Sequence, residues 1–179
     1  MSERTLPGDI SQEEKVRRMI RVNHAGEYGA QRIYAGQLAV LGKHPCAPLL
    51  KHMADQEQEH LDAFAQWMQK RKVAPTIFMP LWHVAGFAMG SATALLGEKA
   101  AMACTVAVES VIDEHYAKQE QQLSDEPELK SVVTKFRADE KEHRDIALEH
   151  GAQSSPLYQI LTTVIVYKTK LAIWLSTRA

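Results

Sequence analysis

Glutamates on the apolar faces of expected helices constrain this sequence more than any other feature. The segments Glu57-Gln58-Glu59-His60 and Glu140-Lys141-Glu142-His143 share the spacing Glu-x-x-His, and 83 positions separate corresponding residues. Because residues three positions apart lie on one face of an α-helix, each segment can present a carboxylate and an imidazole to the same metal ion. A single glutamate, Glu27 or Glu109, precedes each segment by 30 or 31 positions.

Apolar residues recur at helical spacing in four long segments, and the residues just described fall on these apolar stripes. No Val-, Ile- or Thr-rich alternating run flanked by turn residues occurs, so we expect no strands. One glutamate from each of two helices and a Glu-x-x-His from each of the other two form the ligand set of ferritin-like di-metal bundles. We therefore predict an all-α fold in which residues 1–179 form one ferritin-like four-helix domain, with core helices over residues 11–41, 48–71, 98–123 and 127–150.

Such a core has to neutralise four buried carboxylates. Burying one ionised carboxylate without a partner costs several kcal/mol, whereas the whole stability of a domain is only ~5–15 kcal/mol. Two divalent cations would cancel the four negative charges, and an oxygen-rich set with two imidazoles suits iron or manganese. We therefore predict that a di-metal site is held by six residues: Glu27, Glu57, His60, Glu109, Glu140 and His143.

Nearby polar residues are weaker candidates. Asp113 lies one turn after Glu109 and has two open interpretations, a hydrogen-bond acceptor for a metal-bound histidine or a plain surface aspartate. His24, three positions before Glu27, is expected to be a capping or core histidine. The acidic residues beside the ligand positions lie off the stripes, and we expect them to be surface charges: Glu59, Asp62, Asp139 and Glu142.

Three glycines, Gly26, Gly29 and Gly36, lie close to Glu27 in the first expected helix. Glycine inside a helix costs about 1 kcal/mol relative to alanine, so a reason for these residues is expected. Small residues here would let either another helix or a flat ligand approach closely. The sequence leaves both explanations open.

Residues 73–97 contain no Asp, Glu, Lys or Arg. A helix over residues 80–97 would be roughly 26 Å long, which is shorter than the ~30 Å hydrocarbon core of a bilayer, so we expect no transmembrane span. Residues 155–177 form a second expected helix with apolar and basic residues. We predict that these are two additional apolar or amphipathic helices that associate with a membrane surface or line an apolar channel.

The overall composition excludes some classes of partner. Lys and Arg number 21 against 22 Asp and Glu, so no excess of positive charge favours nucleic acid. Cys46 and Cys104 lie far apart in the sequence and are expected to be free thiols. Residues 1–9 lack the features of a signal or transit peptide, and we expect this form to be made in, or already processed into, its working compartment.

These residues together resemble the demethoxyubiquinone hydroxylases of ubiquinone biosynthesis over nearly the whole chain. The segment from Arg21 to Ala30, with Asn23-His24-Ala25-Gly26-Glu27, and the apolar run from Leu81 to Gly97 are far more specific than the ligand spacing alone. The resemblance also rests on three further segments: Glu57 to His60, Cys104 to Glu109 and Glu140 to His143.

The resemblance implies a di-iron, O₂-dependent hydroxylation of the ring of a polyprenyl benzoquinol, with the same six residues as iron ligands and Glu57 and Glu109 as bridging carboxylates. It also implies electron supply by NADH, with His115 and Tyr116 as a relay. The expected location is peripheral, on the cytoplasmic face of a bacterial inner membrane or the matrix face of the mitochondrial inner membrane. Partners implied are a homo-oligomer or a quinone-biosynthesis complex with a lipid-binding accessory protein.

Two other functions use a similar bundle. A ferritin-like iron-storage or redox protein would share the ligands but has no need of the uncharged residues 73–97. A di-iron tRNA-base hydroxylase would need a basic groove, which the net charge of −1 does not favour. Binding to quinone-loaded vesicles would separate these alternatives from the hydroxylase.

Overall fold

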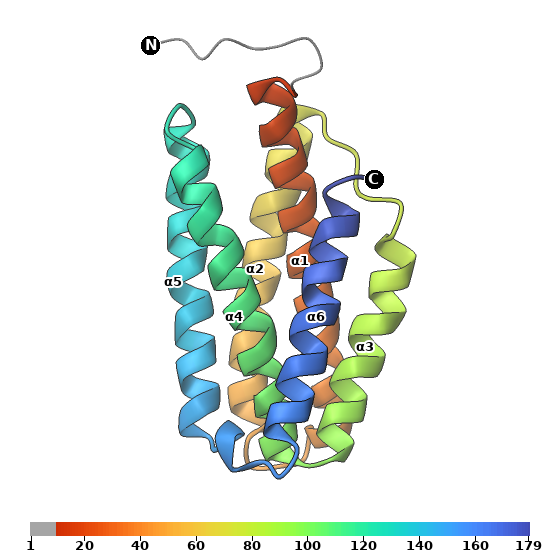
Figure 1. Cartoon of the computed structure of the whole chain (residues 1–179). Helices are drawn as coiled ribbons and strands as arrows, with labels where there is room; N and C mark the ends of the chain where they lie inside the picture. Colours follow the sequence, from red (N-terminus) through yellow and green to blue (C-terminus); the bar gives the residue numbers. More distant parts are fainter. Residues whose placement is uncertain (1–9) are drawn as a thin grey trace.

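Four long helices form a bundle in the computed structural model, which describes residues 10–179 (Figure 1). The first two core helices run antiparallel to each other, and so do the last two. No strand occurs in this part of the chain, so the all-α, ferritin-like prediction is confirmed. The core helices are α1 (Gln12–Leu41), α2 (Ala47–Arg71), α4 (Glu98–Gln122) and α5 (Pro127–Glu149).

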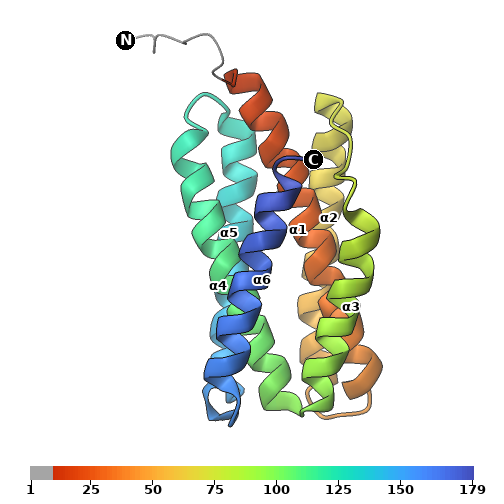
Figure 2. The ribbon, with the colours of Figure 1, turned by 45° about the vertical axis from the view of Figure 1, so that its right-hand side comes forward.

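Two further helices lie outside this core. α3 (Met79–Leu95) packs along α1, and α6 (Tyr158–Ser176) packs mainly along α4 (Figures 1 and 2). A short 3₁₀ helix, η1 (Ala152–Ser154), precedes α6. α6 begins three residues later than predicted because Ser155 has an extended backbone, the conformation favoured before a proline.

Local signals in the sequence set the helix ends. The Ser11 hydroxyl accepts a hydrogen bond from the Glu14 backbone N–H at 3.2 Å, which satisfies one of the free donors at the start of α1. Before α4 and after α5 the chain turns through glycines with positive φ, 102° at Gly97 and 80° at Gly151. These two positions favour glycine because a side chain there would clash with the backbone.

Glycines allow the backbone of α3 to come into direct contact with the backbone of α1. A Cβ atom added to Gly90 would lie 2.0 Å from the Ile33 carbonyl oxygen, and one added to Gly36 would lie 2.2 Å from the Phe87 carbonyl oxygen. By contrast, a Cβ atom on Gly26 or Gly29 would meet nothing within 4 Å. Close helix packing therefore accounts for Gly36, whereas Gly26 and Gly29 face open space.

The buried apolar side chains fall into two clusters along the bundle. On α2, Glu57 and His60 lie between Met53 of one cluster and Phe64 of the other. Corresponding apolar layers lie on either side of Glu140 and His143 on α5. Burying an apolar side chain of the size of methionine or phenylalanine contributes about 1.5–3 kcal/mol to stability. The two layers thus enclose the polar centre and separate it from water.

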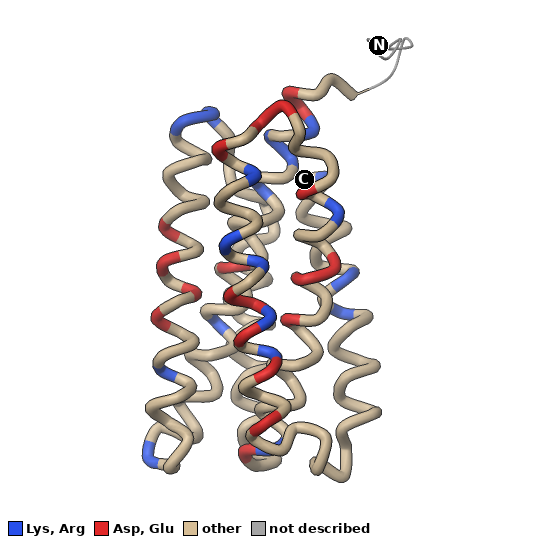
Figure 3. Tube along the Cα trace, turned by 90° about the vertical axis from the view of Figure 1, so that its left-hand side faces the viewer, with Lys and Arg blue, Asp and Glu red and all other residues tan. Residues whose placement is uncertain are grey.

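Charged residues cover the outer surface of the core helices. Figure 3, in which α5 faces the viewer, shows acidic and basic residues alternating along that helix. Within residues 10–179, none of the helices combines the length and apolar character needed to cross a bilayer. The expectation about a leader peptide concerns residues 1–9 and lies outside the described residues.

Candidate metal centre

The six predicted ligands meet in the middle of the bundle, one from α1, two from α2, one from α4 and two from α5. All are at most 1% exposed. The His60 Nδ1 atom lies 3.7 Å from Glu27 Oε2 and 3.3 Å from Glu140 Oε1. The His143 Nδ1 atom lies 3.2 Å from Glu57 Oε1 and 3.6 Å from Glu140 Oε2.

The donor atoms form two adjoining clusters, each able to surround one metal ion. Both clusters contain Glu57 and Glu140, whose two oxygens can face different ions. One cluster is completed by Glu27 and His60, and the other by Glu109 and His143. The geometry therefore favours Glu57 and Glu140 as the shared carboxylates, whereas the resemblance had led us to expect Glu57 and Glu109.

Buried polar atoms at this centre lack hydrogen-bond partners among the described residues. They include both carboxylate oxygens of Glu57 and of Glu140, together with the Nδ1 atoms of His60 and His143. A buried donor or acceptor without a partner costs about 1–3 kcal/mol, and more when it is charged. Two cations at the clusters would satisfy these atoms, so the residues present fit a di-metal group.

At the metal-free centre the pKa values are shifted because several carboxyl groups lie close together in the protein interior, away from water. Burial and the neighbouring Glu140 carboxylate raise the pKa of Glu57 and of Glu109. Burial alone would lower the pKa of His60, but the carboxylates of Glu140 and Glu27 raise it to about 11. Without metal, the site therefore keeps protons that bound cations would displace.

Each histidine has an acceptor on its outer nitrogen. His60 Nε2 lies 3.1 Å from Asp139 Oδ2, and His143 Nε2 lies 3.0 Å from Gln56 Oε1. Such contacts fix the ring and its tautomer so that Nδ1 would be free to bind a metal ion. The expectation that Asp139 is a plain surface charge was wrong, because its carboxylate is only 21% exposed and bonds to His60.

Asp113 was considered above as a hydrogen-bond acceptor for a metal-bound histidine, but its partners in the structure are arginines. Its carboxylate accepts hydrogen bonds from Arg137 at 2.7 Å and Arg144 at 3.4 Å. Asp113 therefore pairs with two arginines of α5 and not with a metal-binding histidine. His24 lies outside both donor clusters.

Two tyrosines donate to the single glutamates. Tyr34 Oη donates to Glu109 Oε1 at 3.0 Å, and Tyr116 Oη donates to Glu27 Oε1. Each tyrosine lies seven positions after one single glutamate and bonds to the other. Tyr34 was not among the residues predicted from the sequence, although this shared spacing of seven would have indicated it.

His115, the other predicted relay residue, lies beside Tyr116 but points to a polar pair. Its Nε2 atom lies 3.3 Å from Asn23 Oδ1 and 2.8 Å from Gln119 Nε2. Burial lowers the pKa of His115 to about 4, and Lys118 contributes in the same direction. The imidazole is therefore neutral at neutral pH.

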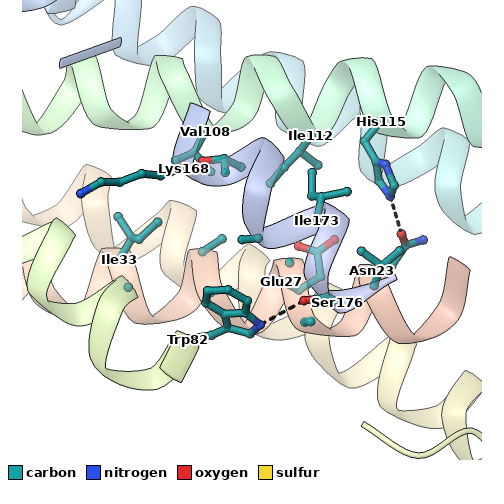
Figure 4. Close-up of a pocket in the computed structure, with 18 of the residues that line it drawn as sticks. Asn23, Glu27, Ile33, Trp82, Val108, Ile112, His115, Lys168, Ile173 and Ser176 are labelled. Carbon is teal, nitrogen blue, oxygen red and sulfur yellow. Dashed lines mark hydrogen bonds between the residues drawn. The ribbon is translucent and has the colours of Figure 1, made fainter. Parts of the chain in front are cut away.

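An apolar pocket adjoins the donor clusters. It has a volume of about 180 Å³ and lies between α1, α3, α4 and α6. Glu27 belongs both to a donor cluster and to the pocket wall. Figure 4 shows Glu27 among apolar side chains, with the Trp82 indole N–H donating to Ser176 Oγ at 3.0 Å. Gly26 and Gly29 also line this space, so they leave room for a ligand.

The fold and the buried donors define a class: a ferritin-like carboxylate bundle that could hold two metal ions. Comparison with known proteins then identifies the family. The family model described as ubiquinone biosynthesis protein COQ7 matches residues 14–176. The chain belongs to this family, which confirms the resemblance drawn from the sequence.

Curated relatives carry consistent names. A protein of Rhodospirillum rubrum named 3-demethoxyubiquinol 3-hydroxylase is 50% identical over 179 residues, covering 99% of this chain and 84% of the relative. Proteins named NADPH-dependent 3-demethoxyubiquinone 3-hydroxylase, mitochondrial, are 52% identical over 167 residues in Dictyostelium discoideum and 51% over 168 residues in Homo sapiens. Each of these two matches covers 91% of this chain and 77% of the relative.

Proposed function

We propose that this chain is an O₂-dependent di-iron monooxygenase that hydroxylates the ring of demethoxyubiquinol, 2-polyprenyl-3-methyl-6-methoxy-1,4-benzoquinol, in ubiquinone biosynthesis. The observation that carries the proposal is the position of Glu27, which belongs at once to a donor cluster and to the wall of an apolar pocket. A ring bound there would lie beside the metal centre. An iron store has no need of such a pocket.

The pocket has a size and lining that suit a quinol ring. An apolar cavity of ~150 Å³ is enough to hold benzene, and this one measures about 180 Å³. Val108, Ile112 and Ile173 supply apolar contacts that would exclude water from the ring (Figure 4). The polyprenyl tail would leave the pocket between α3 and α6, the two helices outside the core.

The donor set assigns a role to each ligand. We propose two iron ions, with Glu57 and Glu140 shared between them, Glu27 and His60 on one ion, and Glu109 and His143 on the other. When bound, the iron ions would supply the activation of O₂. Asp139 and Gln56 would hold the two histidine rings in place, and Tyr34 and Tyr116 would orient the unshared carboxylates.

For the reductant, we propose a reduced nicotinamide. The family resemblance implied NADH, while the names of the mitochondrial relatives specify NADPH. The Tyr116 hydroxyl bonds directly to Glu27, and His115 precedes Tyr116 on the pocket wall. The hydrogen bond from Tyr116 to Glu27 and the position of His115 and Tyr116 on the pocket wall support the proposal that this pair relays an electron to the metal centre.

The surface around the pocket supports peripheral membrane association. Exposed apolar side chains occur on both outer helices, among them Leu81 and Val84 on α3 and Leu171 and Trp174 on α6. Such a surface could rest in the headgroup region while the pocket receives a lipid-soluble substrate. We propose the cytoplasmic face of a bacterial inner membrane or the matrix face of the mitochondrial one. A second copy or a lipid-binding accessory protein remains the proposed partner.

Product analysis tests the activity. The iron-loaded protein, given a short-tailed demethoxyubiquinol, O₂ and reductant, should yield the hydroxylated quinol with one atom from ¹⁸O₂. Glu140→Gln should abolish the product because Glu140 touches both histidines, whereas Glu142→Gln, an exposed neighbour, should not. Hydroxylation by the Glu140 variant at the normal rate would refute the proposal.

A further inference from the structure

Four side chains with donor atoms that can bind metals lie at one end of the bundle, and the di-metal centre uses none of them. His44 and Cys46 lie in the turn between α1 and α2, Glu98 is the first residue of α4, and His150 caps α5. Figure 2 shows that the connections α1–α2, α3–α4 and α5–α6 gather at the end opposite the C-terminus. Residues far apart in the sequence are thereby brought together.

Three of the four residues, His44, Cys46 and Glu98, offer donor atoms that all lie within 4.8 Å of one another. His44 Nδ1 is 3.2 Å from Cys46 Sγ and 4.0 Å from Glu98 Oε2. His150 Nδ1 is 3.6 Å from the other carboxylate oxygen, Glu98 Oε1. With metal–sulfur and metal–nitrogen bonds of ~2.3 and ~2.0 Å, tetrahedral ligands lie roughly 3.3–3.6 Å apart. His150 lies outside the group formed by His44, Cys46 and Glu98, so its ring would have to move closer to the other donors for all four atoms to reach that spacing.

The turn alone does not explain this arrangement. His44 Nδ1 can accept a hydrogen bond from the Cys46 backbone N–H at 3.4 Å, which accounts for the contact between those two residues. It does not account for Glu98, which comes from α4 and lies near His44, or for His150, which comes from the end of α5 and lies near the other oxygen of Glu98. Cys46 is 4% exposed and belongs to the apolar cluster at this end, so its sulfur faces inward.

The donor chemistry selects the ion. One thiolate, one carboxylate and two imidazoles suit Zn²⁺, a borderline-soft cation that prefers four ligands. Burial and Glu98 raise the pKa of the Cys46 thiol in the metal-free chain, and a bound cation would reverse that balance by favouring the thiolate. The thiolate and carboxylate together would neutralise the ion.

We propose that His44, Cys46, Glu98 and His150 form a structural Zn²⁺ site, separate from the di-metal centre. The ion would join the α1–α2 turn, the start of α4 and the end of α5. Because these four helices also carry the six di-metal ligands, the site would hold the bundle closed at one end without taking part in the chemistry. The inference does not depend on the reaction proposed above.

Cobalt substitution tests the site in the iron-loaded protein. Co²⁺ bound to a thiolate gives a sulfur-to-metal charge-transfer band, and the di-metal centre contains no sulfur ligand. One equivalent of Co²⁺ should produce this band, and Zn²⁺ should then displace it. Cys46→Ser should lose the band, and Glu98→Gln should weaken Co²⁺ binding at least about tenfold. His52→Gln, an exposed histidine of α2 outside the cluster, should behave as the parent.

Protection of the Cys46 thiol from alkylation provides a second measurement, which does not require the cysteine variant to fold. Zn²⁺ at one equivalent should slow the alkylation of Cys46 in the parent protein at least tenfold, but not in Glu98→Gln. The absence of the charge-transfer band in the parent, its persistence in Cys46→Ser, or alkylation unaffected by Zn²⁺ would each overturn the proposal.

Discussion

Individual residues of the two halves of the bundle orient each other's ligands. Gln56 and Asp139 each precede the glutamate of one Glu-x-x-His segment, yet each bonds to the histidine of the other segment. Tyr34 and Tyr116 cross between the halves in the same way to reach the single glutamates. The metal geometry therefore depends on contacts that neither half can make alone.

Asp139 gives the first prediction. Asp139→Ala removes the acceptor from His60 Nε2, so that ring loses its fixed tautomer and orientation. We expect one of two iron ions to bind about 10–100-fold more weakly in an anaerobic Fe²⁺ titration. Asp55→Ala, which removes an exposed partner of Lys51, is the control and should titrate as the parent. Unchanged affinity at both irons in the Asp139 variant would contradict the assigned role.

A comparison of two tyrosine variants tests the proposed electron relay. Tyr116→Phe and Tyr34→Phe each remove one hydrogen bond to a single glutamate, but only Tyr116 adjoins His115 on the pocket wall. We expect Tyr116→Phe to slow nicotinamide-driven turnover at least tenfold while turnover with a chemical reductant is retained. Equal losses in both variants, or equal losses with both reductants, would exclude the relay.

The sequence predicted the six residues that meet at the centre because each interrupts an apolar stripe, and helical periodicity shows such interruptions directly. It did not predict Asp139 or Tyr34 as their partners. Asp139 lies one position off the stripe of its own helix, and its role depends on a histidine 79 positions away. A contact of that kind follows from how two helices face each other. For Asp139, the trace in the sequence is that Gln56 and Asp139 occupy equivalent positions before Glu57 and Glu140.

At the scale of elements, the contact between α1 and α3 forms one wall of the pocket. Glycines bring the two backbones together, while Gly26 and Gly29 on the same helix leave the pocket open. All six long helices were predicted from the helical spacing of apolar residues and from the prolines and glycines that mark helix ends. The start of α6 did not, because the extended backbone at Ser155 delays it past Pro156.

A pair of glycine substitutions tests this contact. Gly90→Ala would place a methyl group 2.0 Å from the Ile33 carbonyl oxygen, so the helices must separate. We expect the free energy of unfolding to fall by about 1–3 kcal/mol, measured by urea denaturation. Gly26→Ala meets nothing within 4 Å and should keep or raise stability, by up to ~1 kcal/mol. A Gly90 variant as stable as the parent would show that the contact is not tight.

On the scale of the whole molecule, charged core helices contrast with the apolar outer surfaces of α3 and α6. Val84 is 64% exposed on α3, and Leu171 is 55% exposed on α6. Both helices border the pocket, so a membrane on this side would deliver its substrate directly. The sequence predicted the apolar character of these segments. Their position on either side of the pocket required the packed structure.

Vesicle binding tests the membrane-facing surface. Leu171→Glu should reduce co-sedimentation with vesicles about tenfold or more, because burying a leucine side chain is worth about 1.5–3 kcal/mol. Ser131→Glu introduces the same charge at an exposed position of α5 and should bind as the parent does. If both variants bind equally well, the outer surface of α6 does not face the bilayer.

Counting the iron ions that the protein binds tests whether the buried carboxylates and histidines hold a di-metal centre. Metal-free protein titrated anaerobically with Fe²⁺ should bind two equivalents, and Glu142→Gln should do the same. Glu140→Gln should lose affinity for both ions, because Glu140 belongs to both donor clusters. Saturation of the parent at one equivalent, or two ions bound normally by the Glu140 variant, would contradict the account.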